Sequence, residues 1–327
     1  MKKTLSLFSL ALLCLNVNAQ QDEESKRKKQ AAIAEKFPST RTFDMQFLQY
    51  QPTDFKTERL GEDFQEGKIQ SYSKFRVGIN IPVIERKKWN LTSSFFYQRD
   101  AFTLENVINK AAIAQPVQEI KKDYQTLSGA LSFVYFSELF GKPFIYNSTV
   151  NVDGTQKGAQ RVKGFIGASL VIKRSPQTVM AVGGIFIIDP TSPIPIAPIF
   201  SLEHKFKGSA WVMDMILPQR LLFHRGMFEN GRISVGSELA GDNFYVHNSA
   251  AGYAPVYTVT QMEVSSGITY EHSINKLIFR AKTGFSNPLQ NRLTEKGKPI
   301  GDYIMKLKPE GSMYFGFGVS YNLFKLK

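Results

Sequence analysis

Residues 313–323 read MYFGFGVSYNL, and this stretch decides the fold class. From Phe315 to Leu323 the odd positions are apolar, while the even positions are glycine, serine or asparagine. Successive side chains of a β-strand point to opposite faces, so the two-residue period predicts a strand with one apolar and one polar face. The same alternation occurs in residues 89–98, 144–153 and 277–285.

Composition narrows the class of protein further. The chain has 327 residues, of which 43% are hydrophobic, and it lacks the repeated apolar runs of about 20 residues that a bundle of membrane helices needs. With 13% aromatic and 21% charged residues, it does not have the composition of a disordered chain. The formal net charge is +13, which favours contact with anionic surfaces such as the phosphates of lipopolysaccharide.

The first residues have the form of an export signal. Lys2-Lys3 precede the apolar stretch Leu5–Leu15, and Val17-Asn18-Ala19 fits a cleavage site. We therefore expect residues 1–19 to be a cleaved signal peptide. The single cysteine, Cys14, falls within it, so the mature chain offers no thiolate for a metal site or a nucleophile.

Residues 20–41 differ from the remainder of the chain. They contain the charge block Asp22–Lys29 followed by an alanine-rich stretch, which predicts either a short helix or a disordered segment in the periplasm. A basic run can bind nucleic acid, but this one has no aromatic side chains to stack on bases. We expect a solvated tail and no nucleic-acid partner, with residues 42–327 forming the folded unit.

Two folds share a two-residue period. A soluble β-sandwich buries its apolar faces, whereas a transmembrane barrel turns them toward lipid and keeps polar faces in the lumen. Aromatic residues near strand ends and an alternation of short and long connections favour the barrel. Charges in the middle of strands favour it too, and we predict that six of them face the lumen: Lys74, Arg76, Glu238, Glu263, Arg280 and Lys282.

The predicted fold is an all-β, antiparallel, up-and-down transmembrane barrel of about 14 strands, with both termini on the periplasmic side. Pro218 interrupts residues 211–225, so a 12-stranded barrel remains the alternative. The longer connections are predicted at 51–68, 100–121, 189–195, 247–255 and 287–311, with a short helix within 104–120. The expected strands are 42–50, 69–82, 88–99, 122–136, 143–153, 161–174, 177–188, 196–206, 209–217, 219–225, 231–246, 256–271, 276–286 and 312–324.

The C-terminus carries the most specific local pattern. Gly318, Tyr321 and Leu323, followed by Phe324, resemble the signal that the barrel-assembly machinery reads in outer-membrane proteins. The stretch 211–245, which includes LPQR and LAGDNFY, is similar to an uncharacterised family of Gram-negative outer-membrane barrels of the Bacteroidetes type. That resemblance implies an outer-membrane location and this fold, and it implies no activity.

No constellation of residues identifies an enzyme or a cofactor site. The four histidines, His204, His224, His247 and His272, have no metal-ligand spacing, and no G-x-S-x-G motif occurs. We predict no cofactor and no metal site, and whether the chain is an enzyme stays open. The leading hypothesis is a narrow or plugged passive channel, porin-like, for the uptake of a small solute. The alternatives are a non-transporting surface barrel with ligand-binding loops and an outer-membrane lipid hydrolase.

Overall fold

A computed structural model describes residues 37–110, 117–189, 191–192, 194–323 of the chain. The predicted signal peptide, residues 20–36 and Phe324 lie outside the described residues. One short 3-10 helix, Pro38–Thr40, precedes the strands. The strands are β1 (Phe43–Tyr50), β2 (Thr53–Arg59), β3 (Glu62–Glu85), β4 (Trp89–Asn109), β5 (Val117–Leu139), β6 (Lys142–Thr155), β7 (Gly158–Arg174), β8 (Thr178–Ile188), β9 (Ile196–Lys205), β10 (Val212–Leu217), β11 (Arg220–Met227), β12 (Gly231–His247), β13 (Val256–Ile274), β14 (Leu277–Glu295), β15 (Tyr303–Pro309) and β16 (Ser312–Tyr321).

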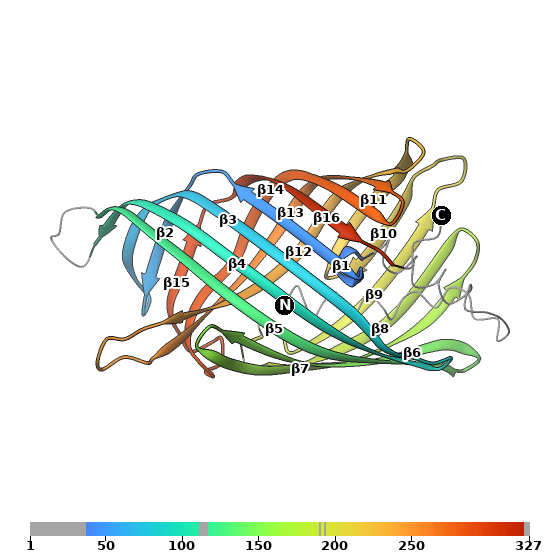
Figure 1. Ribbon diagram of the computed structural model, residues 1–327, viewed down its shortest axis with the longest axis horizontal. Coiled ribbons are helices and arrows are strands. Elements are labelled where there is room, and N and C mark those ends of the chain that lie inside the picture. The colour runs from blue at the N-terminus through green and yellow to red at the C-terminus, as the bar shows by residue number, and fades with distance from the viewer. Residues whose placement is uncertain (1–36, 111–116, 190, 193, 324–327) are drawn as a thin grey trace.

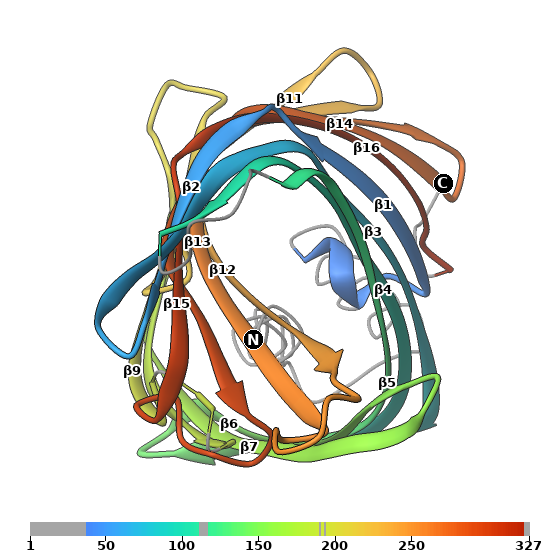
Figure 2. The ribbon, with the colours of Figure 1, turned by 90° about the vertical axis from the view of Figure 1, so that its left-hand side faces the viewer.

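The strands close into a ring (Figures 1 and 2). Every pairing between neighbours is antiparallel, and β1 closes the ring by pairing with both β3 and β16. Both β1 and β2 pair with β3, so they form one strand interrupted at residues 51–52. Likewise β15 and β16 both pair with β14 and form one interrupted strand. The ring therefore has 14 strands, which confirms the predicted all-β antiparallel barrel and its strand number.

The short pair β10–β11 settles the choice between 14 and 12 strands. Its two strands form a hairpin that pairs with β9 on one side and with β12 on the other, so both belong to the wall. No helix among the described residues is long and apolar enough to cross a membrane.

Three predicted long connections are wrong. Residues 51–68 are mostly strand, because β2 and the first part of β3 pair there around a turn at Leu60-Gly61. Most of 100–121 extends β4 and β5, so the helix predicted within 104–120 is replaced by strand at 104–109 and 117–120. Residues 287–311 extend β14 and supply β15.

An apolar belt surrounds the ring at the end where β1 begins and β16 ends, which we call the near end. Strands alternate there between exposed apolar and buried polar residues, as β5 and β6 do with Leu131 and Val150 outside and Ser132 and Thr149 inside. Aromatic residues border the belt on the near side, including the paired Trp89 and Tyr135 on β4 and β5. Exposed belt residues include Ile79, Phe95, Phe133, Ile166, Phe186, Phe279 and Phe317.

Beyond the belt, toward the opposite or far end, the two faces exchange character. On β4 the exposed ion pair of Arg99 with Asp123 of β5 marks the change. Past this level Phe102 and Leu104 point inward, while the exposed side of β5 carries Lys121. The same strands thus turn apolar residues outward at the near end and inward at the far end. Because the outward face becomes polar, the hydrophobic period used for prediction fades where the missed strand segments begin.

The wall is uneven, and β12 bends into the lumen. The six-residue β10 and eight-residue β11 leave β12 without a wall neighbour beyond Leu239 on that side. Residues 240–245 are all buried, and the ring of Phe244 stacks on Tyr124 of β5 at 4.6 Å, although β5 and β12 are not sheet neighbours. In the view down the ring, β12 crosses the interior (Figure 2).

Just before this bend, glycines permit a tight approach of β12, β13 and β14. Gly236, Gly267 and Gly284 are register partners across β12, β13 and β14. A Cβ at Gly267 would lie 2.2 Å from the carbonyl oxygen of Thr283 on the neighbouring strand. No side chain fits at that distance, so the row of glycines is what lets these strands lie so close together.

The belt predicts a difference between two valines of similar exposure. Val150 (57% exposed) lies in the belt and Val117 (50% exposed) lies at the far end. We expect Val150→Arg to lower the free energy of unfolding in phospholipid vesicles by about 2–4 kcal/mol, because the charge would enter hydrocarbon. Val117→Arg should change it by less than about 1 kcal/mol. Urea titration of both variants checks this, and equal losses would contradict a lipid-facing belt.

Candidate functional site

Ion pairs across the lumen divide the interior of the ring. The ammonium Nζ of Lys74 on β3 lies 2.9 Å from Glu263 of β13 and 3.4 Å from Asp242 of β12. The guanidinium of Arg76, also on β3, pairs with Asp242. Because β3 is not a sheet neighbour of β12 or β13, these pairs cross the lumen rather than run along the wall. We call Lys74, Arg76, Asp242 and Glu263 the septum.

Aromatic rings cover the far side of the septum. Lys74 Nζ lies 5.3 Å and 5.2 Å from the ring centres of Tyr50 and Tyr72, which stack on each other at 4.7 Å. The Tyr50 hydroxyl donates to Glu263 at 3.1 Å, and the Tyr72 hydroxyl donates to Asp100 at 2.9 Å. The buried charges therefore have both opposite charges and hydrogen bonds, which a buried ion pair requires to be tolerated.

The six residues predicted to face the lumen are distributed over three clusters. Lys74, Arg76 and Glu263 belong to the septum. Lys282 pairs with Glu238 at 3.1 Å, and Arg280 pairs with Asp44 at 2.7 Å. All of these pairs except the one between Arg280 and Asp44 involve β12 or β13, so these two strands supply most of the acidic partners.

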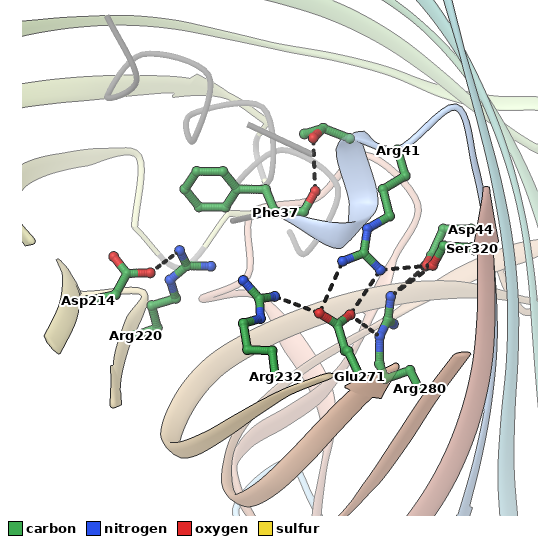
Figure 3. Close-up of polar contacts among 10 residues, drawn as sticks. Phe37, Arg41, Asp44, Asp214, Arg220, Arg232, Glu271, Arg280 and Ser320 are labelled. Atoms are coloured by element: carbon green, nitrogen blue, oxygen red, sulfur yellow. Dashed lines mark hydrogen bonds and ion pairs between the residues drawn. The ribbon is translucent and has the colours of Figure 1, made fainter. Parts of the chain in front are cut away.

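The third cluster lies toward the near end and centres on Glu271 of β13 (Figure 3). Its carboxylate accepts hydrogen bonds from both terminal nitrogens of Arg41, at 2.9 Å and 3.1 Å. It also binds Arg232 of β12 at 2.6 Å and Nε of Arg280 at 3.2 Å. Three guanidinium groups thus share one carboxylate, and Asp44 supplies the second negative charge through Arg280.

Arg41 fixes a segment of chain inside the ring. Its side chain is 1% exposed, and besides Glu271 it donates to the Ser320 hydroxyl at 3.0 Å. Four residues earlier, the Phe37 ring is buried against the inward-facing isoleucines of β8 and β9, with the guanidinium of Arg220 lying 4.3 Å from the ring centre. Residues 37–41, the end of the segment expected to form a periplasmic tail, therefore lie within the lumen (Figure 3).

Two cavities flank the septum. The near chamber, about 230 Å³, reaches from Phe37 and the Glu271 cluster to Arg76. The far chamber, about 270 Å³, is lined mainly by rings and aliphatic side chains and has Glu263, Tyr50 and Tyr72 on its septum side. Representative lining residues of the far chamber are Phe102, Leu104, Tyr124, Phe244, Leu293 and Leu307.

Other residue types of catalytic interest are dispersed. His204, His247 and His272 contact Thr178, Thr155 and Tyr270 respectively. Among the described residues no group of three or more His, Cys, Asp and Glu side chains is arranged to hold a metal ion.

Three residues of the predicted assembly signal, Gly318, Tyr321 and Leu323, are described and lie at the near end. Gly318 is on β16 and faces the interior, where the side chain of Arg280 comes within 3.7 Å of the position that a Cβ would take. Tyr321 is paired with Phe43 and ends β16, and Leu323 is 45% exposed.

Sequence reasoning missed the residues that complete the clusters. Asp242 and Glu271 are acidic partners of two and three cations, but neither was identified as a lumen residue. Glu271 stands on the same face of β13 as Glu263, and that parity was a signal for it. No sequence signal places Arg41, because its position depends on a contact with a residue 230 positions away.

The anchor of the segment 37–41 can be tested by thiol labelling. In a chain that starts at Gln20 and carries Ser39→Cys, this is the only cysteine. We expect Arg41→Gln to raise the labelling rate at least tenfold, because removing one partner of a buried ion pair costs about 3–5 kcal/mol. Arg232→Gln also removes a guanidinium from Glu271 but leaves the segment's own bond, so it serves as the control. Equal rates in both variants would show that Arg41 does not hold the segment.

No protein-family model matches this chain, and no curated protein matches its sequence. Solved structures that resemble it include an outer-membrane channel from Pseudomonas putida F1, with 13% identity over 85% of this chain and 94% of that one, at a TM-score of 0.34. The P. putida toluene transporter TodX has 9% identity, coverage of 90% and 93%, and a TM-score of 0.38. Outer membrane phospholipase A from Escherichia coli has 11% identity, coverage of 84% and 96%, and a TM-score of 0.30. At such low identities and TM-scores, the function has to be argued from the chain's own residues.

Proposed function

We propose that this chain is an outer-membrane β-barrel for passive uptake of a small solute, closed in this conformation by the septum. The membrane location is supported by the apolar belt on the outside, the charged and paired interior, and the export signal predicted at residues 1–19. In lipid, the backbone N–H and C=O groups of every strand must be hydrogen-bonded to a neighbouring strand. The pairing of β1 with β16 meets this need where the two ends of the sheet join. We place the near end, where β1 begins and β16 ends, on the periplasmic side of the membrane.

The single observation that carries the uptake proposal is the arrangement of two chambers on either side of a septum made of side chains. A barrel of 8 strands is filled by its side chains and one of 16 leaves a channel, so 14 strands allow a lumen that a few residues can close. Ion pairs can exchange partners with a passing polar solute at lower cost than a packed apolar core can open, because each charge keeps a partner during the exchange.

The assembly of such a barrel requires recognition of its last strand. We propose that the near end of β16, with Gly318, Tyr321 and Leu323, together with Phe324 supplies this signal to the barrel-assembly machinery. The basic balance of the chain fits contact with lipopolysaccharide phosphates at the membrane surface.

Conductance of the refolded chain in planar bilayers tests the proposal. We expect small, infrequent steps from the unaltered chain. Replacing Lys74 and Arg76 together with Glu places new carboxylates beside Asp242 and Glu263, so repulsion should open the septum, raise conductance severalfold and favour cations. Arg99→Glu, on the outer surface of β4, is the matched control and should leave conductance unchanged. Absence of conductance from a folded double variant would contradict the proposal.

A further inference from the structure

We propose that the near chamber is a binding site for a small organic carboxylate, with Arg76 as its principal ligand. This inference rests on the proposed uptake function, because it names the class of solute. The chamber wall carries five cationic side chains, Arg76, Arg220, Arg232, Arg280 and Lys282, but three carboxylates, Asp44, Glu238 and Glu271. Asp242 pairs with Arg76 and Asp214 pairs with Arg220 behind this wall, so the charges balance and the case for an anion rests on the free donors of Arg76.

Arg76 has donors to spare. Its only hydrogen bond among the described residues runs from Nη2 to Asp242, and Nε and Nη1 are buried without a partner there. Buried polar atoms normally find a hydrogen-bond partner, so the two unpaired N–H groups of Arg76, a residue that lines the chamber, can take an acceptor that enters it. A guanidinium binds carboxylates particularly well, because its planar donors match the two carboxylate oxygens.

The carboxylate Asp242 is itself shared, and this makes room for a competitor. Asp242 accepts from both Lys74 and Arg76, while Lys74 has a second partner in Glu263. An entering carboxylate can therefore bind Arg76 while Asp242 keeps Lys74. No charge of the septum is left alone during this exchange. Because Arg76 belongs to both the septum and the chamber wall, the site lies on the route that the septum closes.

The apolar part of the same wall selects an organic anion over an inorganic one. Phe37, Phe96, Leu222 and the ring of Tyr314 line the chamber together with the charged groups. A cavity of about 150 Å³ with an apolar lining is enough to bind benzene. The near chamber, at about 230 Å³, therefore has space for one ring or a short aliphatic body in addition to a carboxylate.

Calorimetric titration of the detergent-solubilised barrel tests the site, with benzoate, benzamide and inorganic phosphate as probes. Benzoate and benzamide have nearly the same shape, but only benzoate is charged. We expect saturable binding of benzoate, with benzamide and phosphate at least tenfold weaker. Equal binding of benzoate and benzamide would overturn the proposal, since the cavity would then be a neutral or water-filled space. Tighter binding of phosphate would overturn the assignment to an organic anion.

Variants then locate the site. Arg76→Gln should weaken benzoate binding at least tenfold, as truncating a buried charged partner does. Arg99→Gln, which removes an exposed guanidinium from the outer surface of β4, should leave it unchanged. If Arg76→Gln does not fold, Arg76→Lys keeps the charge but not the planar donors, and a loss of affinity is still expected. Equal affinity in the Arg76 and Arg99 variants would overturn the role of Arg76.

The binding test and the conductance test can fail independently of each other. Because the titration needs neither a membrane nor transport, a barrel that conducts ions but does not bind benzoate would refute the site and leave uptake standing. A barrel that binds benzoate, with the expected dependence on Arg76, but never conducts would refute uptake and leave the site.

Discussion

Charge pairing across the lumen is the constraint on which the interior of this protein depends. Lys74, Asp242 and Glu263 come from three strands that are not all neighbours in the sheet, and each is buried. An isolated charge at such a place would carry a large desolvation cost, so the strands must hold their register for the pairs to form. The same requirement draws residues 37–41 inward, because Arg41 completes the partners of Glu271.

Uneven strand length decides where these charges can meet. The short hairpin β10–β11 gives β12 no neighbour beyond Leu239, and the strand then leaves the wall and approaches β5. Asp242, on the bent part of β12, pairs with both Lys74 and Arg76. The glycine row lets the backbones of β12, β13 and β14 lie close together, since a side chain at Gly267 would collide with the next strand. The septum is thus a result of wall geometry as much as of charge.

The strand number and the antiparallel ring could be predicted because the belt segments keep a strict two-residue period. The missed segments, such as 117–125 of β5, lie where most outward residues are polar, as Glu119, Lys121 and Asp123 are. A search for strands with an apolar outward face therefore assigns such a stretch to a loop. Of the site, the septum cations stood out as charges within strands. Their partners and the segment at Phe37 depend on contacts between distant parts of the chain, which no local pattern encodes.

The exchange of faces along β4 and β5 has a mechanical consequence. In the proposed orientation, the nine residues of β5 from Val117 to Gln125 rise roughly 20 Å above the belt at the usual rise and tilt of barrel strands. The outward face of this extension is mainly polar, while Phe102, Leu104 and Tyr124 line the chamber inside, as in a water-soluble barrel. Whatever meets the far rim, on the side away from the periplasm, would meet the hydrogen-bonded strands β4 and β5. Recognition there would lose little conformational entropy and would depend on shape that is already formed.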